Sequence, residues 1–227
     1  MKTKRLFAFL FPLLTSFPAL AIGVGDVTSI MSPDETHLAK EIFNNTDSAR
    51  FVNVRIERLS SPMEGGVIIP MESKSELLST PANLILPGQS KEYFRFIYDG
   101  PSDDKERYYR LSWSDEPIAE YESTKKSKLG QATTSAIIGT ILVVAPRKEH
   151  FDFKREGDTV TNTGNASFRV ISYGPCRDKS QDQGKGCRER YYLMPNVSVK
   201  IKHTDLSSKR THVGIWHGEK LITANAG

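Results

Sequence analysis

The two cysteines of this chain, Cys176 and Cys187, are its most reactive side chains, and they stand close together in the sequence. The ten residues between them are polar and contain two glycines, a composition typical of a flexible loop. A disulfide closing a loop this short would contribute roughly 2–3 kcal/mol on the chain-entropy model. A metal or redox pair is the alternative, but C-x-x-C spacing and an adjacent histidine are both lacking. We therefore predict a structural disulfide and no bound metal.

The remaining reactive side chains do not form a catalytic pattern. The sequence contains no G-x-S-x-G, no H-E-x-x-H and no glycine-rich phosphate loop. The five histidines are scattered, and His212 and His217 would point to opposite faces of a strand. Paired carboxylates occur in turn-like segments, at Asp103-Asp104 and Asp115-Glu116. We expect a protein that is not an enzyme and that carries no cofactor.

A long uncharged segment, Gln131 to Ala145, is the better candidate for function. Proteins normally protect the edge of a sheet with charge or proline, because free N–H and C=O groups pair with other chains. Here Ile141 to Val144 suits a strand buried in a core, whereas Ala132 to Ala136 is too small and polar for one. A strand that is half core and half open edge is suited to binding a partner by β-augmentation.

The elements that must position these residues are β-strands. Runs rich in β-branched and aromatic residues recur between turn-like gaps, and no helical period lasts beyond about two turns. This spacing predicts an all-β sandwich architecture. The expected strands cover residues 51–59, 66–71, 91–98, 107–113, 136–145, 168–173, 197–203 and 213–216.

The chain divides at Ala145-Pro146-Arg147-Lys148, where a proline ends the long strand and charged residues follow. We expect an N-terminal domain over residues 22–146 and a C-terminal domain over residues 147–227. Two sandwiches that meet at an angle would leave a cleft between them. Residues 22–146 hold 13 basic and 18 acidic residues and residues 147–227 hold 15 and 9, so the two surfaces should differ in charge.

Residues 1–21 have the features of a cleavable secretory signal peptide. Lys2, Lys4 and Arg5 precede an apolar stretch, and Ala19-Leu20-Ala21 supplies small residues for a signal peptidase. We expect cleavage after Ala21 and export to an oxidising compartment, where the two cysteines would pair. Removing these three cations leaves 28 basic against 27 acidic residues, so the sequence pI near 9.0 does not indicate nucleic-acid binding.

Several motifs together resemble the periplasmic chaperones of the chaperone–usher pathway, which assemble bacterial pili. The motifs are Leu86-Pro87-Gly88, the aromatic run YYRLSW and the long strand GTILVVAPR that ends at a proline. With NTGN, YGPC and YYLMP, they are most similar to chaperones of the common-pilus (Mat-type) operon, in the alternate branch. The resemblance implies two immunoglobulin-like sandwiches arranged as a boomerang.

The resemblance also implies which strand binds a pilin. In this family, the strand that ends at the interdomain proline is inserted into a pilin subunit whose own sandwich lacks its last strand. Counted back from Pro146, the groove-facing side chains are expected to be Ala132, Thr134, Ala136, Ile138 and Thr140, with Thr140 approaching the domain's own core. A shift of one residue would select Thr133, Ser135 and Ile137 instead.

The family's carboxylate anchor is not matched. Better-known members hold the pilin's C-terminal carboxylate with an arginine and a lysine, and the equivalent positions here fall near Ser29 and on Ile141. Arg110 and Arg107 are the available substitutes, because a guanidinium can bind a carboxylate through two parallel hydrogen bonds. Arg107 has acidic neighbours to pair with, so we prefer Arg110.

The expected function is that of a periplasmic chaperone that binds pilin subunits and the tip adhesin of the same operon and delivers them to an outer-membrane usher. Neither nucleic-acid binding nor membrane insertion is expected. The alternative is a structural pilus subunit or a tip adhesin. A subunit would lack the last strand of its sandwich, whereas this sequence contains that strand and a second domain after it.

Overall fold

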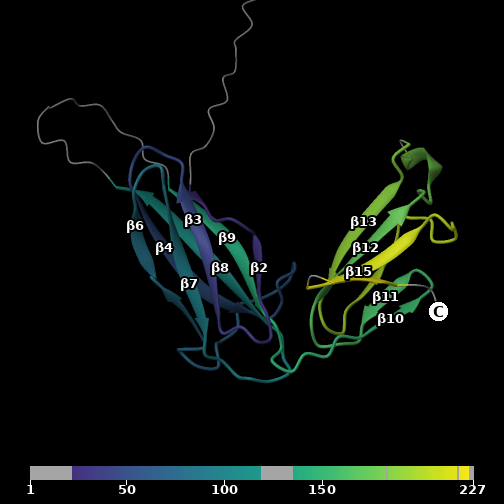
Figure 1. Ribbon diagram of the computed structural model, residues 1–227, viewed down its shortest axis with the longest axis horizontal. Helices are drawn as coiled ribbons and strands as arrows, with labels where there is room; N and C mark the ends of the chain where they lie inside the picture. Colours follow the sequence, from purple (N-terminus) through teal and green to yellow (C-terminus); the bar gives the residue numbers. More distant parts are fainter. Residues whose placement is uncertain (1–21, 119–134, 183, 219, 225–227) are drawn as a thin grey trace, which may run out of the picture.

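The protein consists of two β-sheet lobes joined at a single bend (Figure 1). The computed structural model describes residues 22–118, 135–182, 184–218 and 220–224. Each lobe contains two sheets, and no sheet extends from one lobe into the other within these residues. The prediction of an all-β protein with two sandwiches is confirmed. Across the same residues, no helix has the length and hydrophobicity needed to cross a membrane.

The N-terminal lobe packs a four-stranded sheet, ordered β1-β3-β7-β5, against a five-stranded sheet, ordered β2-β9-β8-β4-β6. The strands of the first sheet are β1 (Ile22–Gly23), β3 (His37–Asn44), β5 (Leu77–Thr80) and β7 (Ser90–Tyr98). Those of the second sheet are β2 (Thr28–Met31), β4 (Arg50–Leu59), β6 (Asn83–Leu86), β8 (Arg107–Pro117) and β9 (Ala136–Val144). All pairs are antiparallel except β2 with β9, which is parallel.

Alternation along β8 sets the core of this lobe. Every second side chain, including Tyr109, Leu111 and Trp113, is fully buried between the sheets. The Trp113 ring meets the ring of Phe94 edge-on at 5.1 Å, and its Nε1–H donates to Thr140 Oγ1 at 3.0 Å. The one polar atom of this large side chain is therefore satisfied, and β8 is fixed to both β7 and β9.

The C-terminal lobe packs a three-stranded sheet, β10-β11-β14, against a four-stranded sheet, β13-β12-β15-β16. The strands are β10 (Phe153–Glu156), β11 (Thr159–Asn162), β12 (Phe168–Gly174), β13 (Cys187–Leu193), β14 (Ser198–Lys200), β15 (His212–His217) and β16 (Lys220–Thr223), with one 3-10 turn at Lys179–Gln181. Phe168, Val170 and Ile215 form the centre of a core of its own.

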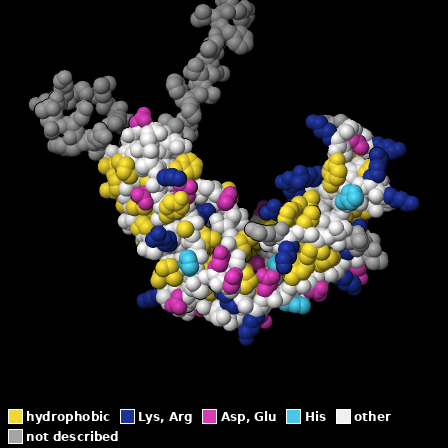
Figure 2. Space-filling view, in the orientation of Figure 1, with side chains coloured by type: hydrophobic (Ala, Val, Ile, Leu, Met, Phe, Trp, Pro, Cys, Tyr) yellow, Lys and Arg dark blue, Asp and Glu magenta, His cyan; other side chains and the backbone are white. Residues whose placement is uncertain are grey.

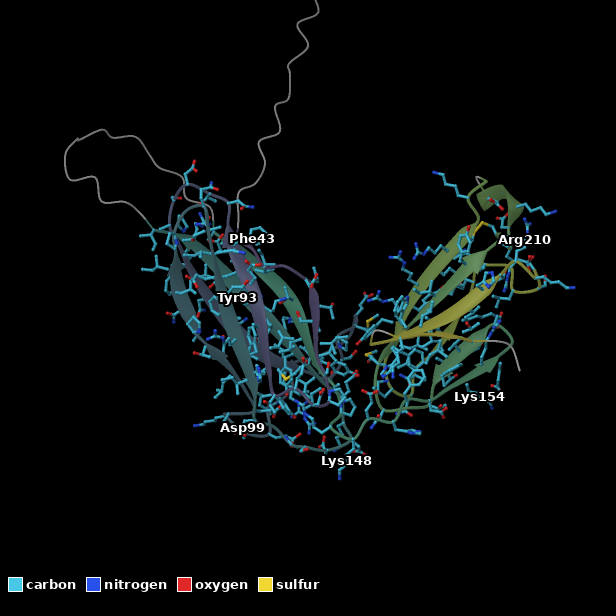
Figure 3. The ribbon with its side chains drawn as sticks, viewed as in Figure 1. Phe43, Tyr93, Asp99, Lys148, Lys154 and Arg210 are labelled. Atoms are coloured by element: carbon cyan, nitrogen blue, oxygen red, sulfur yellow. A yellow bond between two sulfur atoms is a disulfide. The ribbon has the colours of Figure 1, made fainter. Side chains whose placement is uncertain are left out.

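The bend is fixed by hydrogen bonds that connect the two residues after Pro146 to both lobes. The Arg147 guanidinium donates to the carbonyl oxygens of Ser32 and Pro33 at 2.6 and 2.9 Å, and it lies 4.9 Å from the centre of the Tyr98 ring. Lys148 marks the bend in Figure 3, and its carbonyl accepts from Asn165 Nδ2 at 2.8 Å. These contacts hold the lobes at an angle and leave a hollow between them.

Candidate functional site

The strand β9 has two differently paired halves. Along its whole length one edge pairs with β8, from Ala136 opposite Asp115 to Val144 opposite Arg107. On the other edge β2 pairs only with Ile141–Val144. Among the described residues, nothing pairs with the outer edge from Ala136 to Thr140. The segment is therefore an open strand edge, as the sequence predicted.

Backbone alternation identifies the groups on this open edge. The Ile141 N–H donates to Val27 O at 2.8 Å, and the Ala145 N–H donates to Met31 O at 3.0 Å, so odd-numbered residues point their backbone groups to this side. Successive residues of a strand alternate in direction. The N–H and C=O groups of Ile137 and Gly139 therefore lie on the open edge.

The side chains of β9 alternate in the other sense, between the core and the surface. Ile138 packs against the core of the N-terminal lobe, and Thr140 is buried with its hydroxyl on Trp113. Ile137 points outward and is 80% exposed, the largest exposure among the big apolar side chains of the described residues. An exposed isoleucine beside unpaired backbone groups is suited to contact with another chain.

Three of the five side chains expected to bind a subunit lie within the described part of β9, and they face the domain's own core. Ala132 and Thr134 lie outside the described residues. Ala136, Ile138 and Thr140 share the side of β9 that faces the domain's own core, with Ala136 and Ile138 partly buried and Thr140 fully buried. The exposed face is that of Ile137, which belongs to the alternative register.

The two candidate arginines lie on opposite faces of β8. Arg107 points inward, with its side chain only 2% exposed. Its guanidinium donates to both carboxylate oxygens of Asp103, at 2.7 and 2.8 Å, and to Glu72 Oε1 at 3.0 Å. This hydrogen bonding lowers the pKa of Asp103 to about 2 and raises the pKa of Arg107. Arg107 is thus already engaged within its own lobe.

Arg110 lies on the outer face of the five-stranded sheet, opposite Ile141 of β9 and Glu57 of β4. It is partly buried, and no described residue forms a hydrogen bond or ion pair with its guanidinium. The same face carries Tyr108, which packs with Leu59 and Val143 against Met194 of the C-terminal lobe. Arg110 therefore lies on the face that turns toward the other lobe.

The opposite wall of the hollow is the outer face of β12, β13 and β15. Arg169, Tyr192 and Trp216 line a hollow together with Ile30 of β2, so side chains from both lobes meet there. Arg169 is exposed and forms no ion pair with any described residue. The sequence analysis did not identify Arg169. Its place between the inward-facing Phe168 and Val170 would have predicted an outward direction, but not that this face lines the cleft.

Two further arginines lie on this wall. Arg188 and Arg190 on β13 are exposed and share a face with Arg169, because Tyr173 pairs with Arg188 and Ile171 with Arg190. Figure 2 shows further Lys and Arg side chains around the outer end of this lobe. The contrast with the acidic N-terminal lobe follows the charge division seen in the sequence. The cleft wall supplied by the second lobe is cationic and aromatic.

The predicted disulfide is present. Cys176 and Cys187 are joined with an S–S distance of 2.06 Å, and the bond closes the connection between β12 and β13. The described residues contain no cluster of three or more His, Cys, Asp or Glu side chains able to hold a metal ion. The cysteines therefore strengthen a hairpin at the end of the second lobe.

Comparison with known proteins identifies relatives along nearly the whole chain. The chain is 47% identical over 205 residues to a probable fimbrial chaperone EcpB of Escherichia coli O18:K1:H7, and the match covers 90% of this chain and 91% of the relative. It is 46% identical over 219 residues to a probable fimbrial chaperone EcpB of Klebsiella pneumoniae strain 342, covering 96% and 98%. Residues 151–224 match the EcpB C-terminal domain family. The chain belongs to the EcpB family of fimbrial chaperones.

A solved structure supports the fold independently of close sequence similarity. The class 5 fimbriae chaperone CfaA superposes with a TM-score of 0.56 at 13% identity, over 89% of this chain and 97% of that one. At this identity the likeness concerns the fold alone. An EcpB-family chain thus shares its two-lobed architecture with fimbrial chaperones of very different sequence.

Proposed function

We propose that this protein is a non-enzymatic chaperone of the periplasm that holds fimbrial subunits by lending them β9. The observation that carries the proposal is the open edge of Ala136–Thr140, paired on one side and unpaired on the other among the described residues. A subunit that lacks a strand can pair its backbone with Ile137 and Gly139 along this edge. The exposed Ile137 side chain would enter the subunit's groove.

The two halves of β9 suit this role. Ile141–Val144 is fixed between β2 and β8, and Leu142 is fully buried, so the strand is held rigidly at one end. Binding to a preformed strand avoids the entropy cost of ordering a flexible one. Backbone pairing supplies affinity, while the Ile137 position and the expected positions before it, Ala132 and Thr134 or Thr133 and Ser135, supply selectivity.

Arg110 is the proposed anchor for the terminal carboxylate of the subunit. It lies next to β9 on the cleft face, and no described residue forms an ion pair with it. Arg169 on the wall of the C-terminal lobe, which lines a hollow with Ile30, is a second candidate anchor. Arg107 is less suitable because Asp103 and Glu72 already bind its two terminal nitrogens.

The wider role follows from the family and from the sequence of residues 1–21. We propose export by a signal peptide cleaved after Ala21, capture of the subunits and tip adhesin of the same operon, and transfer to an outer-membrane usher. The names of the EcpB relatives favour this role over that of a structural subunit. So does β9, since a subunit would leave the corresponding position of its sandwich empty.

The open edge is tested by a matched pair of substitutions at Gly139. Proline at position 139 removes the backbone N–H that points to the open edge. The hydrogen bonds to β8 are retained, because they are made by the backbone groups of Ile138 and Thr140. An added Cβ at Gly139 meets no atom within 4 Å, so Gly139→Ala is a control with little steric effect. We expect Gly139→Pro to weaken capture of the operon's major subunit at least about tenfold, and Gly139→Ala to change it less than about threefold.

The measurement is recovery of the subunit with the chaperone from periplasmic extracts, with urea unfolding as the check that both variants are folded. A folded Gly139→Pro chaperone that recovers the subunit as well as Gly139→Ala does would refute the proposal. Equal losses in both variants would indicate that the outer face at Gly139, rather than the open edge, is responsible.

A further inference from the structure

Asp115 is a fully buried carboxylate in β8 and is not part of the proposed subunit site. Its Oδ1 atom is 2.5 Å from Arg50 Nε, and Arg50 is itself buried. Its Oδ2 atom accepts a hydrogen bond from the backbone nitrogen of Ile22 at 3.2 Å, across 93 residues of sequence. The two oxygens thus have different partners, and one of these partners is the residue that follows the expected cleavage site.

Ile22 and the residues after it are built into the N-terminal lobe. The Ile22 side chain is 3% exposed and belongs to the core, as does Val24. Strand β1 pairs with β3, with Gly23 opposite Phe43. The Phe43 ring covers Gly23 so closely that a Cβ atom added to Gly23 would lie 2.0 Å from the ring. Phe43 is labelled in Figure 3 at the end of the lobe away from the bend. The position of the Ile22 nitrogen is therefore fixed by packing on both sides.

We propose that the α-ammonium group released at Ile22 by signal-peptide cleavage is a structural ligand of Asp115, so that processing completes the fold of the N-terminal lobe. This inference rests on the proposed export with cleavage after Ala21. Hydrolysis of the Ala21–Ile22 bond adds water: the carboxylate leaves with Ala21 and the amine remains on Ile22. An α-amino group with an ordinary pKa of about 7.7–8.0 is mostly protonated at neutral pH.

Cleavage changes the nature of the donor without moving it. Before cleavage Ile22 offers Asp115 an uncharged amide, and afterwards it offers a cation. The Asp115 carboxylate makes this hydrogen bond charge-assisted in both states. Cleavage adds the attraction between two opposite charges at a buried position, where water screens it little. A carboxylate has about four acceptor positions, so Oδ2 can bind the ammonium while Oδ1 keeps Arg50.

The location connects this contact to β9. Asp115 pairs with Ala136, the first residue of the open half of β9, and with Val52 of β4. A stronger contact at Asp115 would hold the ends of β1, β4 and β8 together at the point where β9 begins. We therefore expect an unprocessed chain to hold its binding strand less firmly than the mature one.

The test is a double-mutant cycle on the purified whole chain. One chain begins at Ile22, released from a fusion partner by a protease that leaves no extra residue, and the other keeps Ala21. Each is made with Asp115 and with Asp115→Asn, and urea unfolding is measured at pH 7. We expect Ala21 to lower the folding equilibrium constant about tenfold with Asp115 present and less than about twofold with Asp115→Asn. An equal effect in both backgrounds would overturn the proposal.

Two controls keep the result clear. Glu116→Gln alters the exposed neighbour of Asp115 and should leave the effect of Ala21 unchanged. If Asp115→Asn does not fold because Arg50 loses this partner, acetylation of the Ile22 amine in the unmutated chain still decides the question. An acetylated chain with the same urea midpoint as the free one would overturn the proposal.

The cleavage site is checked separately by determining the N-terminal residue of the protein purified from periplasm. A mature chain that begins at Ile22 supports the inference. A chain that begins elsewhere contradicts it without affecting the role of β9, which the Gly139 variants test on their own.

Discussion

At the scale of single residues, direction decides what an arginine can do. Arg107 and Arg110 stand three positions apart in one strand, so they point to opposite faces of the sheet. The inward one is held by Asp103 and Glu72 and stabilises its own lobe. The outward one lies beside the open strand with no charged partner among the described residues. Two chemically identical side chains are therefore expected to have different roles.

Substituting each arginine by alanine should separate stability from binding. Arg107→Ala leaves Asp103 without its cation and removes one of the two arginines that pair with Glu72, so it should lower the free energy of unfolding by about 2–3 kcal/mol. Arg110→Ala should change stability by less than about 0.5 kcal/mol and weaken subunit binding roughly 10–150-fold, since a carboxylate contact of about 1.5–3 kcal/mol is lost. Urea unfolding and a binding titration with the purified subunit measure the two effects.

The carboxylate assignment of Arg110 has its own check. A subunit with an amidated C-terminus should bind the unmutated chaperone about as weakly as the normal subunit binds Arg110→Ala. The two changes together should cost little more than either alone, because they remove the same contact. Fully additive losses would show that Arg110 acts on another group, and Arg169→Ala would then be the next variant to measure.

At the scale of elements, the β12–β13 connection depends on its disulfide. Cys176 and Cys187 are separated by 11 positions, and the loop between them is polar and largely exposed. It contributes little to the core, so the crosslink rather than packing restricts it. The part of the cleft wall that contains Arg169 and Tyr192 lies at the other end of these strands, where Phe168 pairs with Leu193.

Replacing both cysteines by serine should lower the free energy of unfolding by about 2–3 kcal/mol, the amount expected for a loop of this length. Subunit binding below the unfolding transition should be unchanged, since the disulfide is remote from β9. Urea unfolding of the double variant, compared with the reduced unmutated chain, gives the value. A loss of binding in a folded double variant would contradict this separation.

At the scale of the whole molecule, a partly buried carboxylate connects the two lobes. Glu106, the residue before β8, accepts hydrogen bonds from the backbone N–H of Ser167 at 2.6 Å and from the Ser167 hydroxyl. Asn165 adds a hydrogen bond from Nδ2 to the Asp104 carbonyl at 2.9 Å. Burial raises the pKa of Glu106 despite the two bonds from Ser167. We call these contacts between Asp104, Glu106, Asn165 and Ser167 the joint. The joint thus contains an acid whose ionised form is less stable in the folded protein than in water.

This raised pKa predicts how stability depends on pH. As pH rises above the ordinary glutamate pKa of about 4.3, Glu106 ionises first in the unfolded chain, so the folded protein loses stability until Glu106 ionises there too. Glu106→Gln removes this loss. We expect the variant to gain stability relative to the unmutated chain between pH 4 and pH 7, measured by urea unfolding.

The exposed Glu92 of β7 supplies the control for that experiment, because Glu92→Gln changes the same chemical group without affecting the joint. It should show no comparable gain with pH. If Glu106→Gln instead loses stability as the pH rises, the hydrogen bonds from Ser167 outweigh burial, and the charged form of Glu106 is the one that the joint favours.

The sequence by itself determined the features that depend on local chemistry. Alternation of apolar side chains, turn residues and Pro146 predicted an all-β chain with two sandwiches, because strand and turn preferences act over a few residues. The absence of charge from Gln131 to Ala145 predicted the open edge, and two cysteines eleven positions apart predicted the disulfide. The resemblance to chaperone–usher chaperones added the family, which the comparisons confirm.

The tertiary structure alone decided which residues meet. A shift of one position reverses every side chain of a strand, so only the packing of Thr140 on Trp113 placed Ile137 on the outer face. The cleft cation Arg169 depends on the angle between the lobes, which local preferences do not specify. The approach of Ile22 to Asp115 spans 93 residues and follows from how the sheets pack, because long-range contacts are set by the whole core.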